Sequence, residues 1–75
     1  MEVEVTAPVV RVVVNGKPQS FPQATTVADA VERLGLAGHK VAVERNGAIV
    51  PRSLHPATTL MEGDVLEIVV AVGGG

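Results

Sequence analysis

The chain has 75 residues, enough for one small domain, and 47% of them are hydrophobic. A domain of this size buries only about 60% of the surface that its unfolded chain exposes, so a substrate cavity of enzyme size does not fit easily inside it. The formal net charge is −2, Phe21 is the only aromatic residue, and cysteine is absent. The charge and the lack of aromatic residues argue against a nucleic-acid partner. The lack of thiols excludes disulfides and thiolate metal sites.

The N-terminal residues carry no export or membrane signal. Residues 1–8, MEVEVTAP, lack the basic start and apolar middle of a signal peptide. No apolar run reaches the roughly 20 residues that would span a bilayer. We therefore expect a cytoplasmic protein, monomeric when free, with no membrane partner. Pro8 interrupts the alternating pattern that precedes it, so residues 1–8 are predicted to form a flexible arm.

A first hairpin is predicted in residues 9–21, VVRVVVNGKPQSF. Valines at positions 10, 12 and 14 have the period of two that places side chains on one face of a strand. Asn15-Gly16 follows, and this dipeptide strongly favours a two-residue hairpin turn because both residues tolerate positive φ. The return strand is expected to run through Phe21.

A short helix is predicted next. Its hydrophobic residues have the spacing i, i+3, i+4 and i+7, and they are Val27, Ala30, Val31 and Leu34. Thr26 is the expected N-cap, with Asp29 completing a weaker form of the capping box. Gly35 can adopt the left-handed conformation that ends a helix. Because two turns are not stable alone, this stripe must pack on a sheet.

A second hairpin pattern occupies residues 41–50, with Asn46-Gly47 as its turn, and Pro51 is expected to end the pairing. Residues 53–64, SLHPATTLMEGD, are predicted to form a connecting loop with a short extended piece near Leu60. Residues 65–72, VLEIVVAV, are predicted to form the last strand.

These elements predict an α+β domain over residues 9–72, with one main helix packed on a four- to five-stranded mixed sheet. When the last strand lies centrally and parallel to the first, this arrangement is the β-grasp fold of ubiquitin. Alternation along the last strand places Leu66, Ile68 and Val70 toward the helix. Three residues then face outward and, with Val72, form the expected docking surface: Val65, Glu67 and Val69.

Residues 73–75 are three glycines, predicted to form a flexible tail. Glycine has no Cβ, so an extended glycine segment can enter a narrow channel in another enzyme. A terminal carboxylate on Gly75 would be ionised at neutral pH. It could attack the α-phosphate of ATP, and the resulting acyl-adenylate could accept sulfur or an amine. The alternatives are a cloning remnant and a tail without function.

The sequence resembles the thiamin-biosynthesis sulfur-carrier family in the stretches VVVNGK, ATTVADAVERL, VAVERNGAIVPR and GDVLEIVVAVGGG, which are distributed over residues 10–75 in the family's order and spacing. The resemblance implies that Gly75 is adenylated and converted to a thiocarboxylate that supplies sulfur to the thiazole ring. It places Gly74 in the family's Gly-Gly pair and gives Gly73 and Gly74 the role of threading into a partner. Residues 1–8 are expected to precede the family's usual start, and the third glycine is an added residue.

The resemblance also implies the partners: an adenylating enzyme that uses ATP, thiazole synthase, and a sulfur donor such as a cysteine desulfurase. No bound cofactor is expected. Molybdopterin and other sulfur carriers, which share the fold and the Gly-Gly end, are the second hypothesis. A ubiquitin-like tag or binding module is the third.

The sequence has no recognisable catalytic group of its own. His39 and His55 have no cluster of carboxylates around them and are expected to be ordinary loop residues, so no metal site is predicted. Glu62 and Asp64 are expected in a tight exposed turn that would leave their pKa values unshifted. We therefore expect a protein substrate and carrier rather than an enzyme.

Overall fold

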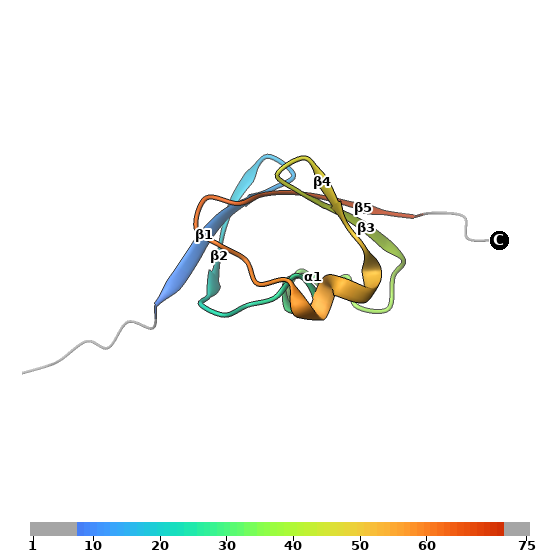
Figure 1. The fold of residues 1–75 in the computed structure, drawn as a ribbon, viewed down its shortest axis with the longest axis horizontal. Helices are drawn as coiled ribbons and strands as arrows, with labels where there is room; N and C mark the ends of the chain where they lie inside the picture. The colour runs from blue at the N-terminus through green and yellow to red at the C-terminus, as the bar shows by residue number, and fades with distance from the viewer. Residues whose placement is uncertain (1–7, 72–75) are drawn as a thin grey trace, which may run out of the picture.

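The computed structural model describes residues 8–71, and the predictions for residues 1–7 and 72–75 lie outside them. Within this range the chain forms one five-stranded sheet, one α-helix and one 3-10 helix (Figure 1). In chain order, the elements are β1 (Val9–Val14), β2 (Lys17–Pro22), α1 (Val27–Arg33), β3 (Val41–Arg45), β4 (Ala48–Val50), η1 (Arg52–Ala57) and β5 (Val65–Val70). The strand order in the sheet is β2-β1-β5-β3-β4.

The last strand lies at the centre of the sheet. β5 is parallel to β1, with Val13 opposite Val65 and Val14 opposite Leu66. It is antiparallel to β3 along the whole of β3, in a register that places Val43 opposite Ile68. A central last strand that runs parallel to the first confirms the β-grasp prediction.

Both predicted hairpin turns are present. Asn15 and Gly16 have φ values of 50° and 81°, and Asn46 and Gly47 have φ values of 52° and 86°. Two consecutive positive φ angles define the type I′ turn, whose twist matches that of the strands it joins. The Asn-Gly dipeptides therefore determine where β1 turns into β2 and where β3 turns into β4.

The helix begins and ends as its sequence predicts. The Thr26 hydroxyl accepts a hydrogen bond from the Asp29 N–H at 3.1 Å, and the Asp29 carboxylate accepts one from the Thr26 N–H at 3.1 Å. Gly35, with φ of 79°, follows the C-cap residue Leu34. Three residues of the predicted stripe are buried and Leu34 packs partly buried against them: Val27, Ala30 and Val31.

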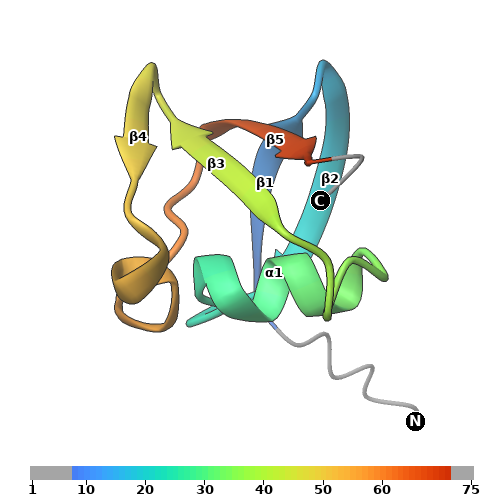
Figure 2. The ribbon, with the colours of Figure 1, turned by 90° about the vertical axis from the view of Figure 1, so that its right-hand side faces the viewer.

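The core lies between the sheet and the helical segments, which cover one face of the sheet (Figures 1 and 2). Alternate residues of β1 and β5 point into it. Its buried members are Val10, Val12, Val14, Phe21, Val27, Ala30, Val31, Val43, Val50, Leu60, Leu66 and Ile68. Leu66 is fully buried, so the centre of the core coincides with the middle of the sheet.

The prediction of a simple loop after Pro51 was wrong, because the first half of that segment is η1. The Leu54 N–H donates to the Pro51 carbonyl at 2.8 Å, and the Thr58 hydroxyl donates to the Leu54 carbonyl at 2.8 Å. η1 packs beside α1 and shares the covering of the sheet, which the sequence reading gave to α1 alone. The expected extended piece near Leu60 is confirmed: Leu60 is 2% exposed and its N–H donates to the Thr25 carbonyl at 2.9 Å.

Candidate functional site

β5 separates its side chains as predicted. Leu66 and Ile68 are 0% and 6% exposed, whereas Val65 and Val69 are 46% and 63% exposed. Glu67, between the two valines, is exposed as well. The predicted inward and outward faces are therefore confirmed, and Val70, assigned to the inner face, is half-buried.

The exposed side chains of β5 continue across β3 and β4. Side chains directly opposite in a sheet point to the same face, and the pairs are Val69 with Ala42, Glu67 with Glu44, and Glu44 with Ile49. We call this surface the outer face, and its residues are Ala42, Glu44, Ile49, Val65, Glu67 and Val69. Ile49 is 63% exposed, which makes the surface markedly apolar for one open to solvent.

Two carboxylates lie side by side in the outer face. Glu44 and Glu67 are directly opposite each other in the β3–β5 ladder, and both are exposed. Like charges in this position destabilise a sheet. Neither forms an ion pair with another residue of the part that the structure describes. The outer face thus combines apolar groups with an acidic pair that its own domain does not neutralise.

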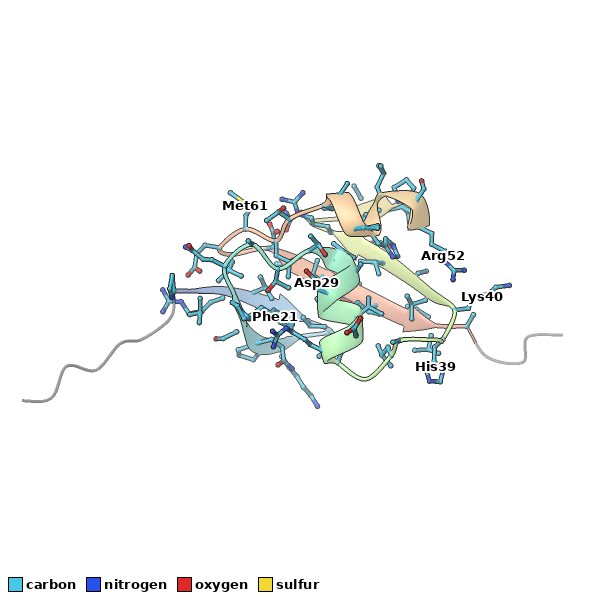
Figure 3. The ribbon with its side chains drawn as sticks, turned by 90° about the horizontal axis from the view of Figure 1, so that it is seen from below. Phe21, Asp29, His39, Lys40, Arg52 and Met61 are labelled. Atoms are coloured by element: carbon cyan, nitrogen blue, oxygen red, sulfur yellow. The ribbon has the colours of Figure 1, made fainter. Side chains whose placement is uncertain are left out.

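The chain leaves the sheet beside a group of basic side chains. The Ala71 N–H donates to the Lys40 carbonyl at 2.8 Å, which holds the chain against the start of β3 one residue beyond β5. His39 and Lys40 lie at this end of the molecule, and Arg52 points toward it from η1 (Figure 3). His39 and Arg52 line one surface hollow of about 250 Å³. Lys40 was not predicted as part of the site because it contacts Ala71 through its main-chain carbonyl, and such a contact leaves no pattern in the side chains.

The predicted tail residues Gly73, Gly74 and Gly75, and the docking residue Val72, lie outside the described residues. Their roles remain predictions. The described chain ends at Ala71, directly before them.

Two turn asparagines hold β5 in place. The Asn15 side chain donates to the Ile68 carbonyl at 3.0 Å and accepts from the Ile68 N–H at 2.7 Å. The Asn46 side-chain oxygen accepts from the Val65 N–H at 2.9 Å, and the main-chain N–H of Asn46 donates to the Val65 carbonyl at 2.8 Å. Each Asn-Gly turn therefore also fixes the strand that presents the outer face.

The prediction of an exposed turn with unshifted carboxylates was wrong for Asp64, which is only 5% exposed. Its oxygens accept hydrogen bonds from Arg45 Nε at 2.8 Å, Asn46 Nδ2 at 3.0 Å and the Met61 N–H at 2.8 Å. Burial alone raises the pKa of Asp64, but the hydrogen bonds from Arg45, Met61 and Asn46 outweigh it, and the net pKa lies below the usual value.

Glu62 also has a lowered pKa, chiefly because its carboxylate accepts a hydrogen bond from the Arg11 N–H at 2.8 Å. The Arg11 side chain adds an ion pair at 2.9 Å. Both carboxylates of the turn are therefore held ionised by structural partners. Groups held in this way join strands to the turn and are poor proton donors at neutral pH.

The two histidines have different surroundings. His39 is an exposed loop residue, as expected. His55 is only 7% exposed, with Nε2 3.1 Å from the Val50 carbonyl, so the expectation of an ordinary loop histidine was wrong for it. Between residues 8 and 71, no three His, Asp or Glu side chains come together in a way that could hold a metal ion. The helices in this range are too short to cross a membrane.

This is a small β-grasp protein with a glycine-rich C-terminal sequence. Its class follows from the order of the strands in the sheet and from the one main helix. The chain belongs to the ThiS family, whose model matches residues 3–75. The match begins at residue 3, so the expectation that residues 1–8 precede the family's region was wrong for most of that segment.

Solved structures agree with this assignment. The crystal structure of the thiamine biosynthesis protein ThiS from Geobacter metallireducens is 35% identical in sequence and has a TM-score of 0.71. That similarity covers 88% of this chain and 100% of the other. A solution structure of a thiamine biosynthesis protein from the same organism has a TM-score of 0.69 and covers 88% of each chain.

Two curated relatives are named thiazole synthase. The one from Paramagnetospirillum magneticum is 43% identical over 65 residues, which cover 87% of this chain and 20% of the relative. The one from Magnetococcus marinus is 44% identical over 61 residues, which cover 81% of this chain and 19% of the relative. The chain thus spans about a fifth of the length of these two relatives.

Proposed function

We propose that this protein is a sulfur carrier of thiamin biosynthesis whose terminal glycine, Gly75, is activated and sulfurated by another enzyme. The observation that carries the proposal is the position of β5 in a member of the ThiS family. The strand is fixed at the centre of the sheet and ends one residue before the Val-Gly-Gly-Gly sequence. In this scheme the folded domain is the part that the partner enzymes bind, and the terminal glycine is the part that reacts.

The proposed chemistry has two steps. A carboxylate oxygen of Gly75 attacks the α-phosphorus of ATP in the partner's site, and pyrophosphate leaves. A sulfur nucleophile then attacks the acyl carbon of the adenylate, and AMP leaves. This chain binds no cofactor in the scheme, since ATP belongs to the adenylating enzyme. With sulfide as the nucleophile the thiocarboxylate forms directly. With a persulfide donor such as a cysteine desulfurase, the attack gives an acyl disulfide, and a thiol must then attack the donor's sulfur, which releases the thiocarboxylate and leaves a disulfide between the thiol and the donor.

In the proposed reaction, the tail contributes its length and its narrow cross-section. Residues 72–75, if fully extended, span at most about 13–14 Å at ~3.3–3.6 Å per residue. Glycine at positions 73 and 74 leaves no side chain to obstruct a narrow channel that leads to the nucleotide.

The outer face contributes the docking surface. Val65 and Val69 offer apolar area at the strand that leads to the tail, and Val72 is included in the proposed surface as the residue next to the glycines. Glu67 between the valines offers a charge that a basic side chain of the partner can pair with. The adenylating enzyme and thiazole synthase are the proposed partners. The two relatives named thiazole synthase support the second of these.

The test is sulfuration of the purified chain, read by intact-mass spectrometry. The proposal requires a chain that ends at Gly75, so the mass of the purified protein is measured first. Incubation with the adenylating enzyme, ATP and sulfide should give the mass of one oxygen replaced by sulfur. Joining of the terminus to lysine amines instead would identify a ubiquitin-like tag. Absence of any ATP-dependent mass change would refute the carrier role.

Tail variants separate a substrate arm from a passive linker. Deletion of Gly74 and Gly75 should abolish sulfuration because the new end does not reach the nucleotide. Gly74→Val should abolish sulfuration because the branched side chain is too wide for the channel. Gly74→Ala should be sulfurated at an intermediate rate. All three variants should melt like the wild type. Sulfuration of Gly74→Val at the wild-type rate would show that the channel argument is wrong.

A matched pair of variants tests the docking surface. Val69→Glu places a charge in the outer face and should weaken binding to the adenylating enzyme while the melt stays unchanged, because Val69 is 63% exposed. Ile68→Glu, one residue earlier, should unfold the domain because Ile68 is 6% exposed. Unchanged affinity for Val69→Glu would remove the outer face from the proposed interface.

A further inference from the structure

One edge of the central strand is only partly covered. The pairing of β1 with β5 ends where Val14 lies opposite Leu66. After Val14 the chain turns into β2. Beyond Leu66, the β1 side of β5 is bonded only by the Asn15 side chain, which forms hydrogen bonds with the N–H and the C=O of Ile68. Beyond Ile68, no residue of β1 or β2 is paired with β5.

The direction of the remaining groups follows from alternation along the strand. The Val65 carbonyl and the Ala71 N–H bond the β3 side of the sheet, whereas both main-chain groups of Ile68 bond the β1 side. Successive residues of a strand direct these groups to opposite edges. The N–H and C=O of Val70 therefore point to the β1 side, past Asn15, and no hydrogen bond from residues 8–71 reaches them.

The outer edge of β2 is protected against pairing. Its two-residue turn makes Val14 and Lys17 a bonded pair, so the even-numbered residues of β2 direct their N–H positions outward. Two of these three residues, Pro18 and Pro22, have no N–H to donate, which leaves Ser20. Proline on an edge strand is a known device against pairing with other chains.

The outer edge of β4 is short. Because Ala48 and Val50 pair toward β3, Ile49 alone directs its main-chain groups outward, and Pro51 follows at once. Each rim of the sheet thus offers an added strand only one residue with both an outward N–H and an outward C=O, Ser20 on β2 and Ile49 on β4. Val70 offers the same two groups on the inner strand β5, and it differs from them in its place, one residue before the chain proceeds toward the tail.

We infer that the main-chain N–H and C=O of Val70 pair with an extended main-chain segment of the enzyme that activates the tail. This inference rests on the proposed function. Such β-augmentation supplies main-chain hydrogen bonds that require no particular side chain in either partner. Pairing at Val70 would fix the position and direction of the chain relative to the partner at the point from which it proceeds toward the tail.

A second copy of this chain is a less suitable occupant. The open edge offers only the two main-chain groups of Val70 within the described range, too few hydrogen bonds to hold two small domains together. In the proposed function the activating enzyme also contacts the outer face and the tail, so its strand would add to that interface.

Residue-resolved amide exchange tests the inference. In the free protein, the Ile68 N–H, which bonds Asn15, should exchange slowly, and the Val70 N–H should exchange fast. With stoichiometric adenylating enzyme, the Val70 N–H should slow by tenfold or more. The outward N–H groups of Ser20 and Ile49 are matched controls and should stay fast.

An N-methyl group at Val70, introduced by ligating a synthetic C-terminal segment, removes the donor directly. It should weaken enzyme binding by roughly 2- to 12-fold, the effect of one hydrogen bond, and leave the melt unchanged. N-methylation of Ala71 is the control. It removes the bond to the Lys40 carbonyl and should lower the melting temperature.

The possible outcomes distinguish the inference from the function. If the enzyme binds and sulfurates the chain while Val70 exchange and the N-methyl variant are unaffected, the pairing site is wrong and the carrier role stands. Protection of Ser20 or Ile49 in place of Val70 would move the contact to a rim and overturn the inference. Concentration-dependent protection of Val70 without enzyme would assign the edge to a second copy. If the enzyme neither binds nor sulfurates the chain, the proposed function fails and the inference fails with it.

Discussion

The side chain of Asn15 takes the place of a strand residue beside Ile68. Its Oδ1 accepts from the Ile68 N–H at 2.7 Å, and its Nδ2 donates to the Ile68 carbonyl at 3.0 Å. The same residue has a φ of 50° in the turn between β1 and β2. One asparagine therefore meets two separate requirements, a left-handed backbone and a mimic of a peptide group.

Asn15→Gly separates these two requirements. Glycine keeps the positive φ at no steric cost but removes both side-chain hydrogen bonds, and we expect a loss of about 1–3 kcal/mol. Asn15→Ala should be less stable by about a further 1 kcal/mol because alanine is strained at this φ. Urea unfolding monitored by circular dichroism measures both. Wild-type stability in Asn15→Gly would show that the bonds to Ile68 contribute nothing.

Val31→Asp should unfold the domain. Val31 is 8% exposed in the face of α1 that covers the sheet, and an aspartate there would be buried without a partner. Unfolding free energies of about 0.05–0.15 kcal/mol per residue leave a small domain little reserve for such a change. Glu32→Asp places the same side chain at the next, exposed position and should melt like the wild type. A cooperative wild-type melt for Val31→Asp would contradict the burial of this helix face.

Asp64 should make the domain sensitive to acid. Its pKa is lowered in the folded state, so its contribution to stability is complete above the unfolded value of about 4 and is lost as the pH falls through the folded pKa. Asp64→Asn should lose about 2 kcal/mol at pH 7 because Arg45 and the other donors then face an amide. Unfolding free energies of the two proteins, measured from pH 7 down to pH 2, should converge. Parallel curves would show that Asp64 is not the titrating group.

Glu67→Gln should stabilise the free domain by a few tenths of a kcal/mol because it removes the like-charge pair with Glu44. Salt screens such a repulsion, so the gain should shrink in 1 M NaCl. Glu62→Gln is the opposite case, because Glu62 is paired with Arg11, and it should lower the melting temperature slightly. A destabilised Glu67→Gln would mean that Glu67 has a favourable contact within its own domain.

The features fixed by local sequence were predictable. Asn-Gly dipeptides located both turns because few other residues accept two positive φ angles in succession. The spacing of Val27, Ala30 and Val31 identified the buried face of α1, and alternation identified the two faces of β5. Each of these patterns is complete within a few residues, so no knowledge of the rest of the chain is needed.

The features that depend on distant partners were not predictable. η1 has neither a helical period nor a capping residue, and it contains Pro56. Asp64 has the sequence context of an ordinary turn, and only the fold places Arg45, 19 residues earlier in the chain, against it. Burial of His55 likewise depends on the Val50 carbonyl and on the packing of η1 beside α1. Sequence spacing gives no sign of these contacts because the fold creates them.

The central position of β5 also bears on how the protein is made. The hairpins β1–β2 and β3–β4 share no hydrogen-bonded ladder, and β5 alone joins them into one sheet. A nascent chain can form either hairpin early, but it cannot close the core until residues 65–70 have been synthesised. Prematurely terminated chains therefore have no stable sheet and should be removed by proteases. Molecules that escape proteolysis should therefore be those translated at least to Val70, shortly before the glycines.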